Sequence, residues 1–244
     1  ADIDFIRCEV KKLLDSGIVE PSVSPWRAQA LVVKDPRHKK RLVIDYSQTI
    51  NRYTPLDAYP LPRIESVINR VAKGVVYSAI DLKSAYHQVP LAIRDKPYTA
   101  FEADGKLYQF CRLPFGITNG VSAFQRFIDG FIERHRLIGT IAYLDDITIY
   151  GSTKQEHDDR LNAFLRAATN DGLTINKEKS MFGVRELRVL GHLVSHDSIK
   201  PDPSHLKPLI ELPVPQDAKS LKRCVGMFSY YSKLVSLSKL KKLL

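Results

Sequence analysis

Two adjacent acidic residues interrupt an apolar part of the chain, and they most constrain its fold. Asp145 and Asp146 lie between residues 140–144 and 147–150, two short runs rich in β-branched and aromatic residues. Such runs with a two-residue connection predict an antiparallel hairpin. A lone Asp pair at this place is more often a plain turn. At the edge of an apolar sheet, however, two like charges repel each other unless a cation such as Mg²⁺ lies between them.

A third acidic residue, Asp81, ends another apolar segment, residues 75–80. Taken alone, an Asp after a buried strand is more often a cap than a metal ligand. If this strand neighbours the hairpin in one sheet, Asp81 meets Asp145 and Asp146 although 64 residues separate Asp81 from Asp145. Three carboxylates could then hold two divalent cations, an arrangement that serves phosphoryl transfer.

The rest of the chain alternates helices with short strands. Apolar spacing predicts helices over residues 3–16, 64–71, 117–136 and 152–172, the last opened by a capping box of Ser152 and Gln155. Strands are expected over residues 30–33, 41–45, 98–102, 106–110, 173–176 and 187–190. These elements predict an α+β fold on a mainly antiparallel sheet, with a domain boundary in the proline-rich segment 201–215.

Composition excludes several classes of protein. Hydrophobic residues make up 44% and charged residues 26% of the 244 residues, which is typical of a globular chain. No apolar run reaches the roughly 18 residues of a membrane helix. The three cysteines form no C-x-x-C motif, so neither a disulfide framework nor a zinc site is expected, and a reducing compartment is the default. The absent initiator Met suggests a segment of a longer chain.

The formal net charge of +10 is concentrated in two zones. Five basic residues crowd positions 34–41, and residues 219–244 contain seven Lys or Arg without one acidic residue. Such zones favour a polyanionic partner, although solvated helix faces explain either zone equally well.

Several motifs resemble those of reverse transcriptases, most closely those of gypsy-type LTR retrotransposons. Residues 143–146, Tyr-Leu-Asp-Asp, resemble the Y-x-D-D box of that family, and residues 81–88 resemble its first aspartate motif. Residues 113–120, which run into Phe124 and Gln125, resemble the loop and helix between the two. Further matching segments are Ile44-Asp-Tyr46, Asp57-Ala-Tyr-Pro-Leu-Pro62, His157, Leu190-Gly-His192, Lys200-Pro-Asp202 and Gly226-Met-Phe-Ser-Tyr-Tyr231.

The resemblance implies a right-hand polymerase fold with fingers, a palm on an antiparallel sheet, and a partial thumb. The implied fingers are residues 1–56 and 89–119, the palm residues 57–88 and 120–200 with a primer-grip hairpin, and the thumb residues 201–244. The implied activity is RNA-directed DNA polymerase, the reverse transcriptase core of a retroelement Pol polyprotein. It would transfer dNTPs to a primer 3′-hydroxyl with two Mg²⁺ ions, which Mn²⁺ can replace.

The resemblance also implies partners and a location. The expected partners are an RNA or DNA template with its primer, dNTP, and the protease, ribonuclease H and integrase segments of the polyprotein. No membrane partner is expected, and the sequence leaves the oligomeric state open. The expected location is the cytoplasm, within a virus-like particle.

Individual roles follow from the same resemblance. The implied metal ligands are Asp81, Asp145, Asp146 and the carbonyl of Leu82. Lys179 would protonate the leaving pyrophosphate, and Tyr86 would fill the place of a ribose 2′-hydroxyl and so select deoxynucleotides. The other implied nucleotide contacts are Lys34, Arg41, Phe115 and Gly116. The implied nucleic-acid contacts are Gln125, Arg126, Leu190, Gly191, His192, Lys222 and Arg223.

The chain departs from the family pattern at a few positions. Residues 47–51, Ser-Gln-Thr-Ile-Asn, replace the usual Arg-x-Leu-Asn, so a template contact of that arginine is not expected. Ser180 replaces a common Cys and Ser198 a turn Gly, and both changes are interpreted as structural.

Two rival functions stay open at the level of sequence. A catalytically incompetent nucleic-acid-binding fragment with a truncated thumb would bind in a salt-dependent way, indifferent to Mg²⁺. An RNA-directed RNA polymerase would use rNTPs, and Tyr86 disfavours it.

Overall fold

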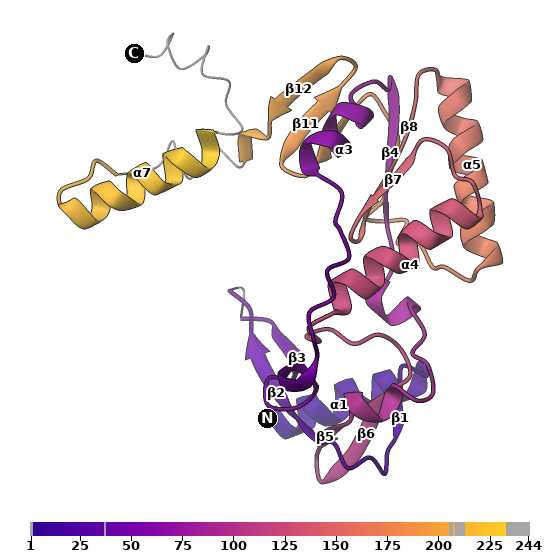
Figure 1. The fold of residues 1–244 in the computed structure, drawn as a ribbon, viewed down its shortest axis with the longest axis vertical. Helices are drawn as coiled ribbons and strands as arrows, with labels where there is room; N and C mark the ends of the chain where they lie inside the picture. Colours follow the sequence, from indigo (N-terminus) through magenta and orange to yellow (C-terminus); the bar gives the residue numbers. More distant parts are fainter. Residues whose placement is uncertain (1, 37, 205–206, 208–212, 233–244) are drawn as a thin grey trace.

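The computed structural model describes residues 2–36, 38–204, 207 and 213–232. The described residues form two units, each built on its own β-sheet, and a helix that lies beyond the second unit (Figure 1). The chain begins in the first unit, crosses to the second, returns, and crosses again (Figure 1).

A four-stranded sheet forms the centre of the second unit, in the order β7-β8-β4-β9. Its strands are β4 (Val76–Asp81), β7 (Thr140–Tyr143), β8 (Asp146–Gly151) and β9 (Met181–Val184). Every neighbouring pair is antiparallel. The expected antiparallel sheet is therefore present, with β4 at an interior position although its neighbours come far later in the chain.

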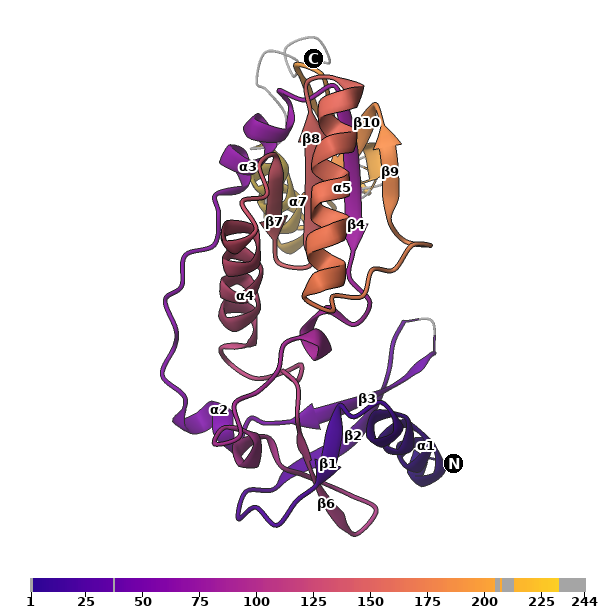
Figure 2. The ribbon, with the colours of Figure 1, turned by 90° about the vertical axis from the view of Figure 1, so that its right-hand side faces the viewer.

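Two helices cover one face of this sheet, namely α4 (Gly120–Arg134) and α5 (Lys154–Asn170). Figure 2 shows α5 running along β4 and β8. The apolar stripe of α4 and Phe164 of α5 pack on Ile80, Ile147 and Ile149, all of which are buried. Burial of this apolar surface is the main favourable contribution to the stability of the unit.

The opposite face carries α3 (Ile64–Val71) and a three-stranded antiparallel sheet (Figure 1). The strands of this smaller sheet are β10 (Glu186–Val189), β11 (His192–Ser195) and β12 (Ser198–Pro201). Together they bury Tyr77 and Ile141 of the central sheet. Because strand side chains alternate, the face that contacts α3 and β10 also carries Asp81 and Asp146 at its open end.

The first unit is a five-stranded sheet in the order β1-β6-β5-β2-β3. Its strands are β1 (Val19–Pro21), β2 (Ala28–Lys34), β3 (Lys40–Asp45), β5 (Phe101–Ala103) and β6 (Lys106–Phe110). All pairs are antiparallel except β2 with β5, which is parallel. The helix α1 (Asp2–Asp15) packs on this sheet through Val10.

Other helical elements lie in the described part of the chain. They are α2 (Ile50–Tyr53), the 3-10 helices η1 (Ala85–Gln88) and η2 (Lys96–Thr99), and α7 (Ala218–Ser232) beyond the small sheet (Figure 1). None of the helices described in the structure has the length and apolar content to cross a bilayer. The lysines after position 232, which belong to the second basic zone, lie outside the described residues, as does part of the proline-rich segment.

Most expected elements are confirmed, but several expected bounds are wrong. Residues 96–99 form the 3-10 helix η2, so the strand expected over residues 98–102 begins only at Phe101. The N-cap of α5 is Thr153 rather than Ser152, because Thr153 Oγ1 accepts a hydrogen bond from the Glu156 amide (3.1 Å). Residues 173–176 form no strand, only an isolated bridge between Ile175 and Leu82. The strands β1, β9, β11 and β12 were not expected, since three or four residues carry too little pattern to predict a strand.

A buried polar contact fixes α5 to the sheet beneath it. His157 is fully buried, and its Nε2 lies 2.8 Å from Ser78 Oγ of β4. Gly151, at the end of β8, makes this approach possible. A Cβ on Gly151 would lie 2.5 Å from the backbone nitrogen of His157 and 2.7 Å from its Cα.

We expect Gly151→Ala to lower the free energy of unfolding by about 1–3 kcal/mol, because the added methyl meets backbone that cannot move without shifting α5. Gly130→Ala is the control, since Gly130 lies within α4 and a methyl added there would have nothing within 4 Å, so this variant should gain up to about 1 kcal/mol. Urea unfolding followed by circular dichroism measures both. Equal stability of the two variants would contradict the packing described.

Candidate active site

The three aspartates singled out in the sequence lie at one edge of the central sheet. Asp81 is the last residue of β4 and Asp146 the first residue of β8, and the two are directly opposite in the antiparallel register. Asp145 precedes Asp146 in the turn from β7. The pairing of β4 with β8 therefore brings together acidic residues that are distant in the chain.

The turn itself differs by one residue from the expectation. Tyr143 pairs with Asp146, so the two turn residues are Leu144 and Asp145, and Asp146 belongs to the strand. Leu144 has a φ of +55°, in the left-handed region. For a residue with a Cβ this conformation costs about 1–2 kcal/mol, so other contacts must hold the turn in place.

Like charges accumulate at this edge. The pKa of Asp146 is raised, first by the loss of hydration next to the strand ends and then by the negative charges of Asp145 and Asp81. Like charges directly opposite each other in a sheet are destabilising. A cation bound between these carboxylates would remove that repulsion.

Two hollows border the carboxylates. One, of about 270 Å³, is lined by Asp81 and Asp145, and the other, of about 110 Å³, by Asp81 and Asp146. Lys179 lines both hollows. Within the described residues, no three His, Cys, Asp or Glu side chains are gathered closely enough to form a ready metal cluster. The oxygen donors nevertheless fit Mg²⁺, which commonly takes one or two carboxylates and completes its shell with water and substrate phosphates.

The larger hollow combines acidic, aromatic and basic side chains. Tyr86 of η1 lies between two aromatic rings, 4.8 Å from Phe115 and 5.0 Å from Phe124 between ring centroids. Burial, with a smaller effect of Asp145, raises the pKa of Tyr86. The full lining of this hollow is Asp81, Leu82, Lys83, Ser84, Ala85, Tyr86, Phe115, Asp145, Asn176 and Lys179.

The loop that carries Phe115 is tied to the first unit. Asn51 Nδ2 donates to the carbonyl of Gly116, and Asn51 Oδ1 accepts from the amide of Thr118, both at 2.8 Å. The Phe115 side chain is 55% exposed, so it can still contact a ligand. Gly116 follows Phe115 but does not line the hollow.

Two residues near Lys179, Ser180 and Asn176, hold the end of β4. The Asp81 amide donates to Ser180 Oγ (3.0 Å), and Ser180 Oγ donates to the carbonyl of Asn176 (2.7 Å). The Asn176 amide donates in turn to the Asp81 carbonyl (2.8 Å). The sequence-based interpretation of Ser180 as structural agrees with these contacts.

Sequence reasoning missed the polar residues Lys83, Ser84, Thr148, Asn176 and Arg188 of the two hollows. Lys83 and Ser84 follow Asp81 closely in the sequence, so this nearness could have indicated that they belong to the site. Asn176 and Arg188 carried no local signal. Asn176 reaches the site through its backbone hydrogen bond to Asp81, and Arg188 through the packing of β10 against the face of the central sheet.

The basic hairpin of β2 and β3 separates two residues that were predicted to act together. Arg41 is opposite Val33, and Lys34 is opposite Lys40, so Arg41 and Lys34 lie on opposite faces. Arg41 Nη2 lies 3.6 Å from Asp35 Oδ2. Neither residue lines the two hollows at the aspartates, although the hairpin tip points from the first unit toward the second (Figures 1 and 2).

The structure corrects the role expected of Gln125 in α4, whereas that of Arg126 stays a prediction. Gln125 cannot contact a template, because its side chain is fully buried and bonded to the protein. Arg126 is on the surface, but its Nη2 lies 2.8 Å from Asp57 Oδ2, and its guanidinium stacks over the ring of Tyr59. Sequence alone could not separate the buried position from the exposed one.

The turn between β10 and β11 consists of Leu190 and Gly191, with φ values of +48° and +79°. Two successive positive φ values match a type I′ hairpin turn, which explains the Gly. The carbonyl of Gly191 accepts from the Asp202 amide (3.0 Å), and His192 Nδ1 lies 3.1 Å from the Leu190 carbonyl. Lys222 and Arg223 are exposed on α7.

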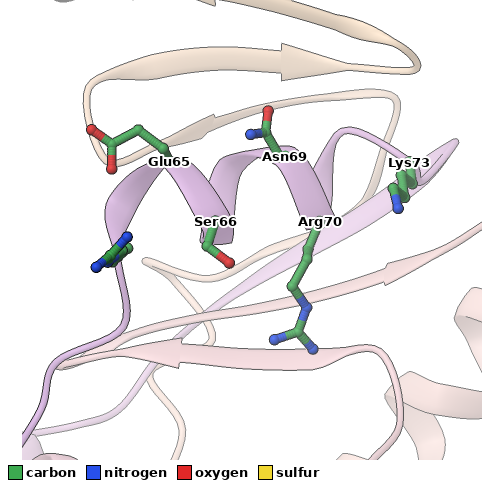
Figure 3. Close-up of a pocket in the computed structure, with 6 residues that line it drawn as sticks. Glu65, Ser66, Asn69, Arg70 and Lys73 are labelled. Carbon is green, nitrogen blue, oxygen red and sulfur yellow. The ribbon is translucent and has the colours of Figure 1, made fainter.

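A separate hollow of about 660 Å³ lies on the outer face of α3, away from the aspartates. Figure 3 shows Ser66 and Arg70 on one side of this helix face and Glu65 and Asn69 on the other. Its lining consists only of surface polar residues of one helix and its flanks. This hollow is open to solvent, and none of the three aspartates lines it.

Comparisons with known proteins address the family. Residues 21–194 match the family described as reverse transcriptase (RNA-dependent DNA polymerase). The chain is 36% identical over 236 residues to the retrovirus-related Pol polyprotein from transposon gypsy of Drosophila melanogaster, and 35% identical over 234 residues to that from transposon opus. The alignments cover 93% of this chain but only 22% and 23% of those polyproteins, so the chain spans about a fifth of their length.

Solved structures share the fold. A foamy viral protease-reverse transcriptase in complex with double-stranded DNA matches with a TM-score of 0.81 at 22% identity, over 93% of this chain and 39% of that one. The same type of protein in complex with an RNA/DNA hybrid matches with a TM-score of 0.79 at 22% identity, over 94% of this chain and 31% of that one. The expected right-hand polymerase fold is thereby confirmed.

The charge at the sheet edge predicts a pH-dependent effect of Asp146→Asn. Because the pKa of Asp146 is raised in the folded chain, protonation of Asp146 stabilises the fold at low pH. This stabilisation is lost as pH rises through the folded-state pKa. In metal-free buffer the stability of the variant relative to the wild type should therefore increase as pH rises above the ordinary Asp pKa of about 4, by less than about 1 kcal/mol because the residue is exposed to solvent. Urea unfolding at several pH values measures this gain.

The control is Asp104→Asn, in a turn with positive φ that Asn tolerates. Arg7 lowers the pKa of Asp104, so this variant should instead lose stability relative to the wild type as pH rises. A gain of Asp146→Asn that stays constant with pH would contradict the charge crowding.

Proposed function

Because this chain belongs to the reverse transcriptase (RNA-dependent DNA polymerase) family, we propose that it is the polymerase core of a retroelement Pol polyprotein and extends a primer with deoxynucleotides on an RNA template. The observation that carries the proposal is the direct opposition of Asp81 and Asp146, with Asp145 in the adjoining turn. The chemistry of these residues suits transfer of a nucleotidyl group.

We assign the first unit, residues 1–56 and 89–119, to the fingers of the polymerase. Residues 57–88 and 120–200, which contain the central sheet and the β10–β12 sheet, are assigned to the palm. Residues 201–244, of which α7 is described, are assigned to the thumb. In support, the chain passes from one unit to the other close to each of these boundaries (Figure 1).

The carboxylates of Asp81, Asp145 and Asp146 and the carbonyl of Leu82 would hold two Mg²⁺ ions, or Mn²⁺ in their place. When bound, the ions supply charge neutralisation for the triphosphate and favour deprotonation of the primer 3′-hydroxyl. Lys179 lines both hollows at these carboxylates, where its ammonium group would donate a proton to the leaving pyrophosphate.

The aromatic cluster beside Asp145 would select the sugar. Tyr86 has its ring held between Phe115 and Phe124, so it cannot easily turn away from a ligand in the hollow. A 2′-hydroxyl that meets this fixed ring is excluded by sterics, which favours a deoxynucleotide. Phe115 and the backbone at Gly116 would contact the same nucleotide. Its phosphates would be neutralised by Arg41 and by Lys34, which lies nearer the hairpin tip.

The nucleic acid would be held mainly through its backbone. The backbone turn of Leu190 and Gly191, with His192, would lie against the primer, and Lys222 and Arg223 of α7 would contact phosphates further along the duplex. The matched foamy viral proteins are in complex with double-stranded DNA and with an RNA/DNA hybrid, which supports a duplex substrate for this chain. The protease, ribonuclease H and integrase segments would be its neighbours in the polyprotein.

We expect Asp81→Asn and Asp145→Asn each to lower the rate of primer extension by about 100-fold or more, because each removes a carboxylate that stabilises charge in the transition state. Extension of a DNA primer on an RNA template, with and without Mg²⁺, measures the rate. The control is Asp197→Asn. Asp197 also lies in a two-residue hairpin turn, and its positive φ is one that Asn tolerates, so this variant should extend the primer as the wild type does.

Full extension by both Asp81→Asn and Asp145→Asn would refute the polymerase assignment. Tight, salt-sensitive binding of the primer–template without any extension by the wild type would instead favour a non-catalytic nucleic-acid-binding fragment.

We expect Tyr86→Ala to reduce the preference for dNTP over rNTP by about tenfold or more, because the ring no longer blocks the 2′-hydroxyl. Single-nucleotide incorporation gives kcat/KM for both substrates. Tyr98→Ala, an exposed tyrosine of the first unit, serves as control and should keep the wild-type preference. Unchanged selectivity in Tyr86→Ala would show that another residue selects the sugar.

A further inference from the structure

A buried glutamine contacts the turn that carries Asp145. Gln125 lies in α4 with its side chain fully buried. Its Oε1 accepts a hydrogen bond from the amide of Leu144 at 2.7 Å, and its Nε2 donates to the carbonyl of Ala142 at 3.2 Å. One side chain therefore bonds the last part of β7 and the first residue of the turn.

A further hydrogen bond, to Asp129, fixes the orientation of the Gln125 amide group. Its Nε2 also donates to Asp129 Oδ1 (2.9 Å), one turn further along α4. The other carboxylate oxygen of Asp129 accepts from the hydroxyl of Tyr59 (2.8 Å). Because a carboxylate only accepts, the nitrogen of Gln125 must face Asp129, and the oxygen is left to face Leu144.

The contact falls on the strained residue of the turn. Leu144 has a φ of +55°, and the next residue is Asp145. Leaving a buried or half-buried amide without a partner costs free energy comparable to the strain of the left-handed conformation. Loss of the acceptor would therefore let the turn relax, and the adjacent Asp145 would move with it.

We propose that Gln125 is a positioning residue, which holds the Leu144 amide and thereby keeps the Asp145 carboxylate beside Asp81. This inference rests on the proposed function for its effect on catalysis, but the hold on the turn can be measured without it. Gln125 touches neither of the hollows at the aspartates. It acts through the backbone of the turn alone.

Three variants separate the contacts of this side chain. Gln125→Met keeps the length of the side chain and removes every hydrogen bond. Gln125→Glu keeps the acceptor for Leu144 but sets a second carboxylate against Asp129. Adding Asp129→Asn to Gln125→Glu restores a donor opposite the new carboxylate, so the double variant should recover part of the loss.

The chain offers a matched control. Gln155 donates to Asp159 Oδ1 (3.1 Å) with the same four-residue spacing, on the exposed face of α5 and outside both hollows at the aspartates. Gln155→Met therefore removes the same kind of Gln–Asp hydrogen bond without affecting Asp81, Asp145 or Asp146.

The experiment combines hydrogen exchange with kinetics in the intact chain. In Gln125→Met we expect the Leu144 amide to exchange about tenfold faster or more, as loss of one hydrogen bond implies. We expect kcat for primer extension to fall about tenfold or more, with the Kd for primer–template within about twofold of wild type. Gln155→Met should change neither quantity, and the double variant should recover part of both.

Unchanged exchange at Leu144, or faster exchange with unchanged kcat, would overturn the positioning role. A kcat that falls only in proportion to the folded fraction, measured by circular dichroism, would also overturn it. If the wild type extends no primer, the proposed function fails instead, and exchange at Leu144 still decides whether Gln125 holds the turn.

Discussion

The antiparallel pairing of β4 with β8 is the constraint on which the rest of the site depends. It sets Asp81 opposite Asp146 at the open end of the sheet and leaves Asp145 in the adjoining turn. Loss of hydration, and then the like charges gathered at this edge, raise the pKa of Asp146. A sheet built this way gives up some stability at one edge, and a divalent cation bound there would restore it.

Polar contacts from elsewhere in the chain hold this edge in place. Ser180 fixes the amide of Asp81 from the segment before β9, and Gln125 fixes the Leu144 amide from α4. His157 and Ser78 tie α5 to the far side of β4. The apolar packing supplies the bulk of the stability, while these few directional contacts set the positions of individual carboxylates.

Much of the fold and the acidic part of the site could be predicted from sequence, because apolar strands flank the aspartates and the motifs keep their order. The roles of buried polar residues could not. Gln125 lies on a helix whose apolar stripe gives no sign of whether one polar neighbour points inward or outward, and Arg126 next to it points outward. Arg188 reaches the site only because β10 packs on the face of the central sheet. Lys34 and Arg41 are separated by a register that composition does not reveal.

The central claim is that strand pairing creates a site for divalent cations between Asp81, Asp145 and Asp146. The most direct measurement is anomalous diffraction at the manganese edge from crystals of the chain grown with Mn²⁺, a primer–template and a dNTP that cannot react. The account predicts anomalous density in contact with Asp81 and with the 145–146 pair. Manganese bound at other residues only, with Asp81 turned away from any ion, would contradict it.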